Sequence, residues 1–580
     1  MRTASLSSAV FLSALLTSSC AAPHRVTTPA PEPHLRPVLS GEWRVTLAES
    51  DGVELDFVMT FSTDRAGRWA GHSRAGGARE LAGTAASVLG RLSGELPEGA
   101  LIHTTGQLRA AGGDTVHMDG ILESPFMGRR LWRGYVAGGR MQSELSRDGG
   151  AVAGRVTAVP HSSPGPLRDY PALAVALVGA IRGTIFDPAL LEREEYRRFF
   201  QELHARFARA RDDLDAVASF QALKPSLGIS HLEFIRNPRI AATPLDSIIA
   251  GASGADPSRF VRLSFPAPGV AFLRVTRWDR VHDAVGAAFV RIDSAGAPFL
   301  ILDIRGNPGG DASAVAPLRH LVRDTVPVGA FAGRRWYAAN GGPPRPQDFG
   351  RIPRLPSTGA PADLIRALRE HGAVLGVAVP REPRYAGTVF LLTDRGTASA
   401  SEPLAHALKE WGLATLIGER TAGAMLTALP QPLGDGWIAV VPEADYVPAD
   451  GVRLEGRGVQ PHVAVASNEV FLAVADRIAA NAPFSAEVLR GSSYEALQRP
   501  QDAERAYRHA LQAVDAQRPP PPPASRAAVH RHLARILTAR RQEQRAAEHW
   551  REVLRHLPDD KEALAAVRGV RPGGTGRGPE

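Results

Sequence analysis

A strand-like run that ends at a glycine and leads into a helical pattern constrains the fold of this chain most. Residues 388–393 are apolar and rich in β-formers, and Gly396 interrupts the run. Leu404, Leu408 and Trp411 then recur on one face of a predicted helix. A strand, a tight turn and a helix in this order predict an α/β domain.

Ser399 lies in that turn and has two interpretations. The first free amides of a helix point outward at such a position, where they can stabilise a developing oxyanion beside a nucleophile. Ser399 and Glu402 also match the S-x-x-E pattern of a capping box, in which the serine has no chemical role. Caps far outnumber nucleophiles, so this segment by itself favours the cap.

The composition indicates a globular protein of several domains. The 580 residues suffice for three or four domains, and 44% of them are hydrophobic. The net charge of +8 comes from arginines spread through every segment, with no dense basic run interleaved with aromatics. We therefore expect no nucleic-acid partner.

The N-terminus predicts export. A basic start at Met1 and Arg2 precedes an apolar stretch and the small residues around Cys20, the only cysteine. This resembles a bacterial lipoprotein signal peptide at 1–20, in which Cys20 becomes lipidated and anchors the protein to the membrane of the cell envelope. The Pro-rich residues 21–38 would form a flexible linker. The alternative is ordinary secretion with cleavage near Ala22.

Residues 39–160 predict an antiparallel β domain. Apolar residues alternate, as in Trp43, Val45 and Leu47, and Gly-containing turns recur between the strands. A barrel of the lipocalin type or a sandwich fits this pattern. The histidines of this segment have no metal-ligand spacing and are interpreted as solvated.

Residues 165–235 predict a helical cap that ends near Gly228. Tyr196, Phe199, Phe200 and Leu203 recur at helical spacing. Ser230 and His231 follow the break, and together they offer a candidate base beside an orienting hydroxyl. A lone histidine at such a junction is more often structural.

A second glycine-rich turn follows the apolar run 299–302. The run is typical of a strand buried on both faces. Gly306, Gly309 and Gly310 then permit unusual backbone angles and the close approach of a substrate. An ordinary strand-to-helix turn is the alternative.

Three motifs in order resemble the tail-specific, or C-terminal-processing, serine peptidases of family S41. They are Asp-Ile-Arg-Gly-Asn-Pro-Gly-Gly at 303–310, Gly-Thr-Ala-Ser-Ala-Ser-Glu at 396–402 and Ile-Gly-Glu-Arg-Thr-Ala-Gly at 417–423. The resemblance covers about residues 170 to 480. It implies a crotonase- or ClpP-like α/β peptidase core at 236–480 and makes Ser399 the nucleophile.

The resemblance also bears on the base. In the processing-protease branch a lysine about 25 residues after the serine accepts its proton, but Ala424 stands at that position here. The branch similar to the tricorn core and to the interphotoreceptor retinoid-binding protein uses a Ser-His pair and a late Glu, and often lacks a PDZ insertion. Ser230, His231 and Glu455 occupy those places.

These residues imply an acyl-enzyme mechanism. A serine hydroxyl needs a neighbouring base, for which we expect His231, with Ser230 and Glu455 orienting and stabilising the imidazolium. The oxyanion donors we expect are the backbone amides of Ala400 and Gly309, with Gly310 as the neighbouring possibility. Removal of one such donor typically lowers the rate by about 10²- to 10³-fold. No cofactor and no metal ion is expected.

Residues 485–570 predict a repeat. Positions 491, 494, 503, 507 and 510 recur 43 residues later as 534, 537, 546, 550 and 553. The pattern resembles tetratricopeptide repeats lengthened by the prolines at 519–523, and it suggests a protein partner. Residues 571–580 have the composition of a disordered tail.

The sequence thus predicts an exported, multidomain α/β serine peptidase that acts on peptides or proteins. Two alternatives stay open. One is an inactive relative that binds peptides or apolar ligands in the same cleft. The other is an envelope scaffold that acts through its repeats.

Overall fold

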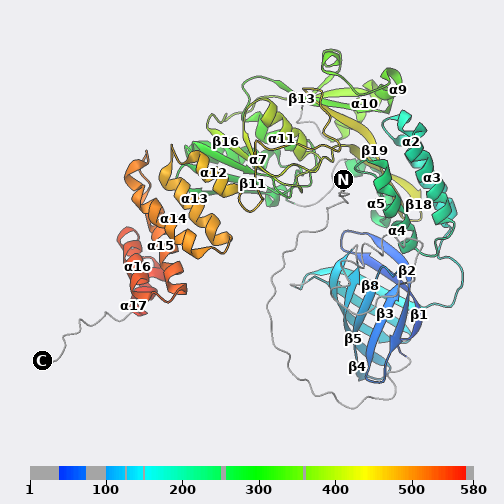
Figure 1. Ribbon diagram of the computed structural model, residues 1–580. Helices are drawn as coiled ribbons and strands as arrows, with labels where there is room; N and C mark the ends of the chain where they lie inside the picture. The colour runs from blue at the N-terminus through cyan, green and yellow to red at the C-terminus, as the bar shows by residue number, and fades with distance from the viewer. Residues whose placement is uncertain are drawn as a thin grey trace. The chain divides into compact units, whose positions relative to one another are not determined.

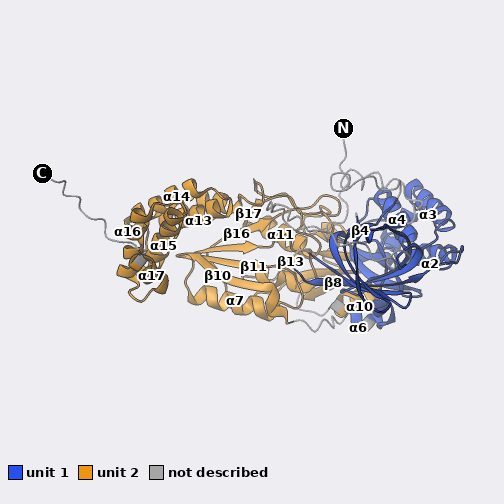
Figure 2. Cartoon of the chain, turned by 90° about the horizontal axis from the view of Figure 1, so that it is seen from below, with its two compact units in different colours: residues 1–252, 332–343, 426–445 blue, residues 253–331, 344–425, 446–580 orange. Residues whose placement is uncertain are grey.

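The structure, a computed structural model, describes residues 38–73, 100–124, 127–147, 150–249, 256–356 and 361–569. The chain divides into two compact units, which Figure 2 colours separately. Unit 1 comprises residues 1–252, 332–343 and 426–445, and unit 2 comprises residues 253–331, 344–425 and 446–580. Cys20 and the predicted tail at 571–580 lie outside the described residues.

Unit 1 begins with a closed antiparallel barrel of eight strands, drawn in blue to cyan in Figure 1. Each strand pairs with the next, and β1 also pairs with β8 to close the barrel. The predicted antiparallel β domain is confirmed as a barrel. The strands are β1 (Gly41–Glu49), β2 (Glu54–Thr63), β3 (Arg68–Ser73), β4 (His103–Gly112), β5 (Thr115–Ser124), β6 (Gly128–Ala137), β7 (Arg140–Ser146) and β8 (Val152–Pro160).

Aromatic side chains fill the barrel interior. The rings of Trp69 and Trp132 meet edge to face with centroids 5.7 Å apart, and Phe61 packs against both of them. Alternate residues such as Val45 and Leu47 point into the same core. An eight-stranded barrel is just wide enough for its own side chains to fill, which is the case here.

Helices follow the barrel in unit 1 and dock on it through buried carboxylates. The N-terminus of α4 supplies Asp212 and Asp213, which accept hydrogen bonds from the backbone amides of Val58 and Asp56 on β2. Arg168 binds Asp213 at 2.9 Å and compensates its charge. The helices are α2 (Tyr170–Thr184), α3 (Glu194–Phe207), α4 (Asp213–Leu223), α5 (Pro238–Ala242), α6 (Leu245–Ile249) and α9 (Arg334–Asn340), with 3₁₀ turns at Pro188–Glu192 and Lys224–Leu227.

Three antiparallel strands complete unit 1. They are β9 (Glu233–Arg236), β18 (Thr427–Gly434) and β19 (Trp437–Pro448), whose last residues from Tyr446 belong to unit 2. β19 pairs with β18 on one side and β9 on the other. The short strand β9 begins two residues after His231, so this sheet holds the backbone next to the predicted base.

Unit 2 is built on a six-stranded sheet in the order β10-β11-β12-β16-β17-β20. β10 is antiparallel to β11, and the strands from β11 to β20 are parallel. Their bounds are β10 (Val261–Ala267), β11 (Val270–Val275), β12 (Phe299–Asp303), β16 (Thr388–Thr393), β17 (Thr415–Gly418) and β20 (Val463–Ala464). The predicted strands at 299–302 and 388–393 therefore lie side by side.

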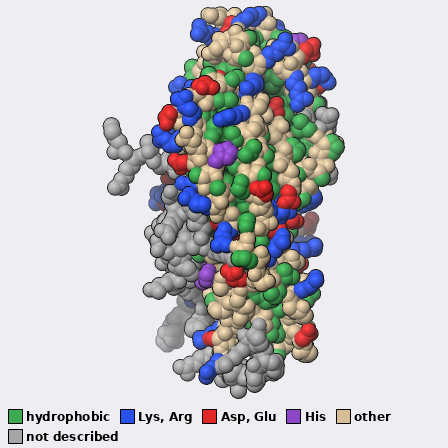
Figure 3. Space-filling view, turned by 90° about the vertical axis from the view of Figure 1, so that its right-hand side faces the viewer, with side chains coloured by type: hydrophobic (Ala, Val, Ile, Leu, Met, Phe, Trp, Pro, Cys, Tyr) green, Lys and Arg blue, Asp and Glu red, His purple; other side chains and the backbone are tan. Residues whose placement is uncertain are grey.

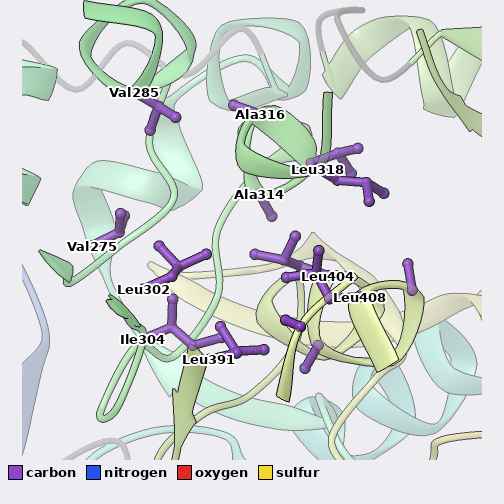
Figure 4. Close-up of a cluster of buried hydrophobic side chains, with 14 of the residues drawn as sticks. Val275, Val285, Leu302, Ile304, Ala314, Ala316, Leu318, Leu391, Leu404 and Leu408 are labelled. Carbon is purple, nitrogen blue, oxygen red and sulfur yellow. The ribbon is translucent and has the colours of Figure 1, made fainter. Parts of the chain in front are cut away.

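Helices cover both faces of this sheet. Leu302 and Leu391 face one core with α7 (His282–Ser294), α8 (Ala316–Arg319) and α11 (Ser401–Glu410), part of which Figure 4 shows. Ile301 and Phe390 face the opposite core with α12 (Val470–Ile478) and the first half of α13 (Pro483–Ala496). All five residues of β12 are buried, as its continuous apolar run predicts.

A second strand group in unit 2 comprises β13 (Val326–Gly333, whose last two residues belong to unit 1), β14 (Arg354–Pro356) and β15 (Ala373–Ala378), next to α10 (Pro361–His371). The predicted helical face at 404–411 needs one correction. Leu404 and Leu408 are buried, whereas Trp411 is 43% exposed because α11 ends at Glu410 and the chain turns away.

The C-terminal helices of unit 2 pack in sequence: α13 (Pro483–Ala496) on α14 (Pro500–Gln512), α14 on α15 (Pro523–Ala539), α15 on α16 (Glu543–His556), and α16 on α17 (Lys561–Gly569). Tyr507 and Trp550, equivalent in the predicted repeat, each lie in an interhelical core. These helices fit the predicted hairpins, and their classification as tetratricopeptide repeats stays a prediction.

The surface carries mixed charge. On the face in Figure 3, Lys and Arg side chains are scattered among acidic and apolar ones. Among the described residues, no helix has both the length and the apolar character needed to cross a bilayer.

Candidate active site

The turns after three neighbouring parallel strands meet at the carboxyl edge of the unit 2 sheet. Ser399 follows β16, the glycine turn follows β12, and the segment 421–424 follows β17. β16 pairs with both of the other strands. The amide of Ala398 donates to the carbonyl of Asn307, and that of Ala422 donates to the carbonyl of Thr397. Ligand sites of open α/β sheets form at this edge.

Ser399 has a left-handed backbone conformation, with φ of 52°. Such an angle is uncommon for a residue with a side chain and is retained where the surroundings impose it. Two neighbours impose it here. The Ser399 amide donates to the carbonyl of Ala424 at 3.0 Å, and its carbonyl accepts from the amide of Glu402 at 2.8 Å.

The capping-box interpretation of Ser399 is wrong. The N-cap of α11 is Ala400, and no side chain caps this helix. Glu402, the other half of the predicted box, points away from Ser399: its carboxylate accepts from the Thr421 hydroxyl and from the amides of Gly423 and Ala424, at 2.6 to 2.8 Å. Ser399 therefore does not sit in this turn as a helix cap.

Glu402 holds the segment 421–424 in place, whereas the sequence pattern predicts that it caps α11. It is fully buried, and this burial raises the pKa of its carboxyl, with the nearby charge of Glu455 acting in the same direction. Its three hydrogen bonds fix the segment whose Ala424 carbonyl holds Ser399. The signal was present, because Glu402 belongs to the motif at 396–402, but its partners lie about 20 residues further along the chain.

The glycine turn lies directly against Ser399. A Cβ atom on Gly309 would stand 2.5 Å from the Ser399 Cβ and 2.9 Å from the Ala400 amide nitrogen, and Gly309 has φ of 103°. A Cβ atom on Gly310 would overlap the carbonyl of Trp278. Only glycine fits at either position.

The three predicted oxyanion donors differ in their partners. The Gly309 amide donates to Oδ1 of Asn307 at 2.9 Å, and the Asn307 side chain in turn donates to the carbonyl of Val275. Among the described residues, the amides of Gly310 and Ala400 have no hydrogen-bond acceptor. The backbone amides of Gly310 and Ala400 are therefore the candidates for oxyanion donors, whereas the Gly309 amide already donates to Asn307.

Glu455 reaches the same region from the segment before β20. Its Oε2 accepts from the Met425 amide at 2.7 Å, and the amide of Gly456 donates to the carbonyl of Gly423. The structure brings Ser399, Ala400, Gly309, Gly310 and Glu455 together in unit 2.

Ser230 and His231 belong to unit 1 and form a pair there. The Ser230 Oγ and the His231 Nδ1 are 2.7 Å apart, and His231 has φ of 57°. Two of the six non-glycine residues with positive φ in the described chain are therefore predicted catalytic residues. Burial, aided by the charge of Lys224, lowers the pKa of His231 to about 4. The imidazole is neutral near pH 7, as a base must be.

A match to a known family covers the turns that surround Ser399. Residues 269–465 match the model of Peptidase family S41. These residues are a peptidase family S41 domain. The S41 domain contains Ser399 and its surrounding turns, whereas Ser230 and His231 precede it.

Curated relatives of the S41 domain are processing proteases. The chain is 27% identical over 175 residues to the carboxy-terminal processing protease CtpB of Bacillus subtilis (strain 168), which covers 30% of this chain and 29% of that protein. It is 26% identical over 199 residues to a carboxyl-terminal-processing protease of Synechocystis sp., which covers 34% and 38%. The chain thus spans about a third of the length of these relatives.

The chain is also similar to solved structures, at lower identity. The photosystem II D1 C-terminal processing protease is 17% identical, with 52% of this chain and 94% of that chain covered and a TM-score of 0.34. The tricorn protease is 11% identical, with 73% and 56% covered and a TM-score of 0.29.

Proposed function

We propose that this protein is a serine endopeptidase that hydrolyses peptide bonds through an acyl-enzyme intermediate. One observation carries the proposal most directly. Ser399 is held in a left-handed turn at the carboxyl edge of the S41 sheet, does not cap its helix, and is followed by the amide of Ala400, which has no acceptor among the described residues. This local geometry supports the assignment of Ser399 as a nucleophile beside an oxyanion donor.

Acylation begins when the Ser399 Oγ attacks the carbonyl carbon of the substrate. Its proton passes to His231, and the negative charge that develops on the carbonyl oxygen is stabilised by the amides of Ala400 and Gly310. The tetrahedral intermediate then expels the amine, which takes the proton from His231. Water, deprotonated by the same imidazole, hydrolyses the acyl-enzyme and releases Ser399.

Ser230 and Glu455 support this proton transfer. When the Nδ1–H of His231 donates to the Ser230 Oγ, the lone pair is left on Nε2, the nitrogen that accepts the serine proton. We assign to Glu455 the stabilisation of the imidazolium through a hydrogen-bonded chain that includes Ser230.

The replacement of the family's lysine by Ala424 supports His231 as the base. The Ala424 carbonyl accepts from the Ser399 amide, so position 424 adjoins the nucleophile, yet it carries no amine. The same loss would suit a peptide-binding protein without catalysis. A direct test is therefore needed to separate the two.

The test is serine-directed labelling. The full chain should react with a fluorophosphonate probe and cleave unstructured peptides, and Ser399→Ala should abolish both. Ser401→Ala serves as a neighbouring control and should retain labelling. Absence of labelling in the wild type, with peptide binding retained, would favour the noncatalytic alternative.

The cooperation of Ser399 with His231 has its own test. Residues that act as a unit are strongly non-additive, so Ser399→Ala, His231→Ala and the double variant should share nearly the same residual rate. If the rate losses of the two single variants instead multiply in the double variant, His231 does not act together with Ser399.

We also propose export and anchoring through Cys20, and binding of a protein partner through α13–α17. The first rests on the signal-like sequence at 1–20 and the second on the repeat pattern. Detergent-phase partitioning of the wild type, lost in Cys20→Ser, tests the anchor. Partner capture that survives Ser399→Ala but is lost on deletion of residues 485–570 tests the repeats.

A further inference from the structure

Three potential metal ligands converge on the surface of unit 2, outside the candidate active site. His406 and Glu410 lie on α11, and Asp450 lies in the turn after β19. The Nε2 of His406 is 3.2 Å from an Oδ of Asp450, and one ligand atom from each of the three residues lies within 4.8 Å of the others.

The α11 helix presents two of these ligands because of its periodicity. Leu404 and Leu408 point into the core of the S41 domain (Figure 4). His406 and Glu410 are each two residues further, about 200° around the helix, so they emerge together on the opposite side. Residues at this i, i+4 spacing are neighbours on a helix surface.

The cluster combines a held imidazole with accessible carboxylates. The side chain of His406 is 12% exposed and that of Asp450 is 27% exposed, while Glu410 is an exposed residue. The Asp450 carboxylate is also fixed by the Val452 amide, which donates to it at 2.9 Å. The imidazole therefore has a defined direction, and the exposed side of the cluster remains open to solvent and ions.

The carboxylates of this cluster lie apart from the basic Lys and Arg side chains. Among the described residues, no lysine or arginine forms an ion pair with Glu410 or Asp450. The carboxylates of Glu410 and Asp450 lie together at this place, and a divalent cation would offset their negative charge. One nitrogen and two carboxylate donors suit Zn²⁺ and similar transition metals, whereas Ca²⁺ and Mg²⁺ prefer oxygen ligands throughout.

We propose that His406, Glu410 and Asp450 bind a divalent transition-metal ion of the Zn²⁺ class. Ligand bonds of about 2.0–2.2 Å require the three donor atoms to draw closer together than 4.8 Å, which side-chain rotation of the exposed Glu410 provides. The site goes beyond the proposed peptidase activity and does not depend on it.

The ion would cross-link two segments of the S41 domain. It joins α11, which begins two residues after Ser399, to the segment that runs from Asp450 to Glu455. Its three ligands are not among the groups to which we assign the bond-breaking step. We expect it to stabilise the arrangement of the two segments.

The experiment measures metal binding on the full chain in the Ser399→Ala background, which prevents self-cleavage. Calorimetric titration with Zn²⁺ and visible absorbance with Co²⁺ give stoichiometry and coordination, and thermal unfolding gives the stabilisation. His406→Ala should remove one bound ion, and Glu410→Gln should weaken that binding about tenfold or more. Ca²⁺ and Mg²⁺ should not raise the unfolding temperature of the parent protein or of either variant.

Two controls make the result specific. His371→Ala removes a histidine beside an acidic neighbour, Glu370, where no group of three potential ligands is found among the described residues, and it should leave binding intact. The Nδ1 atoms of His530 and His549 are 2.9 Å apart, so this histidine pair is another place where an ion could bind. His549→Ala removes the pair and shows whether it accounts for any bound ion.

The Glu410→Gln variant guards against misfolding, because it leaves the contact between His406 and Asp450 intact. Wild-type stoichiometry and affinity in both His406→Ala and Glu410→Gln would overturn the proposal. So would a Zn²⁺-induced stabilisation that is as large in His406→Ala as in the parent protein. In that case the three residues form only a helix-to-turn contact.

Discussion

Gly309 lies so close to Ser399 that a methyl group on its Cα would stand 2.5 Å from the Ser399 Cβ. Gly309→Ala should therefore displace Ser399, the proposed nucleophile. A shift of about 1 Å at a reacting group lowers the rate on the order of 100-fold, and we expect kcat/KM to fall by at least that much. Gly306→Ala is the matched control, because Gly306 also has positive φ, 68°, but no atom lies within 4 Å of the place where its Cβ would stand. Comparable losses in both variants would mean that backbone strain, not contact with Ser399, is the cause.

The acid limb of the pH profile should report His231. Burial and the charge of Lys224 lower the pKa of this histidine to about 4, from an ordinary value of 6.5. The base is neutral above that pKa, so at pH 5 about nine-tenths of the maximal kcat/KM should remain. Lys224→Met removes the positive charge, raises the pKa of His231 and moves the acid limb to higher pH. Lys561→Met, an exposed lysine on α17, should leave it in place. An acid limb near 6.5 in the wild type would contradict the assignment.

Removal of the Glu402 side chain should destabilise the S41 domain. In Glu402→Ala the hydroxyl of Thr421 and the amides of Gly423 and Ala424 lose their acceptor in a buried site. At about 1–3 kcal/mol for each unsatisfied group, the free energy of unfolding should fall by roughly 3 kcal/mol or more. Glu402→Gln retains one acceptor oxygen and should lose less. Hydrogen exchange of residues 415–425 would locate the effect, and unchanged protection there would argue against it.

A lysine at position 424 should partly replace His231. The Ala424 carbonyl accepts a hydrogen bond from the Ser399 amide, so this position adjoins the proposed nucleophile. His231→Ala combined with Ala424→Lys should hydrolyse peptides about 10-fold or more faster than His231→Ala alone, with a rate that rises with pH as the amine loses its proton. Ala424→Met, of similar length but without an amine, is the control. Equal rates with Lys and Met would show that the amine does not act as a base.

Two helix glycines should respond to alanine with opposite signs. A Cβ atom on Gly491 of α13 would overlap the ring of Tyr507 on α14. Gly179 of α2 is exposed, and a Cβ atom there would have no neighbouring atom within 4 Å outside its own helix. Gly179→Ala should stabilise by about 0.5–1 kcal/mol through helix propensity. Gly491→Ala should instead destabilise its helix pair by about 1–3 kcal/mol. Hydrogen exchange of α13 and α14 measures the second effect, and serine labelling should be unaffected.

Local patterns in the sequence were sufficient for much of the fold. The alternation at 43–47 predicted the antiparallel strands of the barrel, because one face of each strand is buried. The unbroken apolar run at 299–302 predicted a strand covered on both faces, and helices cover both. Spacing along the chain carries this information, since burial repeats with the period of each element.

The neighbours of the serine could not be predicted in this way. Ser399 and Glu402 have the spacing of a capping box, and nothing nearby contradicts that interpretation. The contradiction comes from Thr421, Gly423 and Ala424, which capture the Glu402 carboxylate. The end of α11 was also missed, because the periodicity that includes Trp411 does not show where the chain leaves the helix.

The sequence by itself therefore determined that Ser399 stands at a strand-to-helix turn, that a glycine-rich turn at 303–310 precedes it and that Glu455 follows it. Only the tertiary structure decided that this serine is not a cap, that the Gly309 amide donates to Asn307, and that Asp450 lies beside His406 and Glu410 of α11. The physical reason is common to all three. Each depends on hydrogen bonds or charges that meet across adjacent strands and turns, between residues that local spacing does not relate.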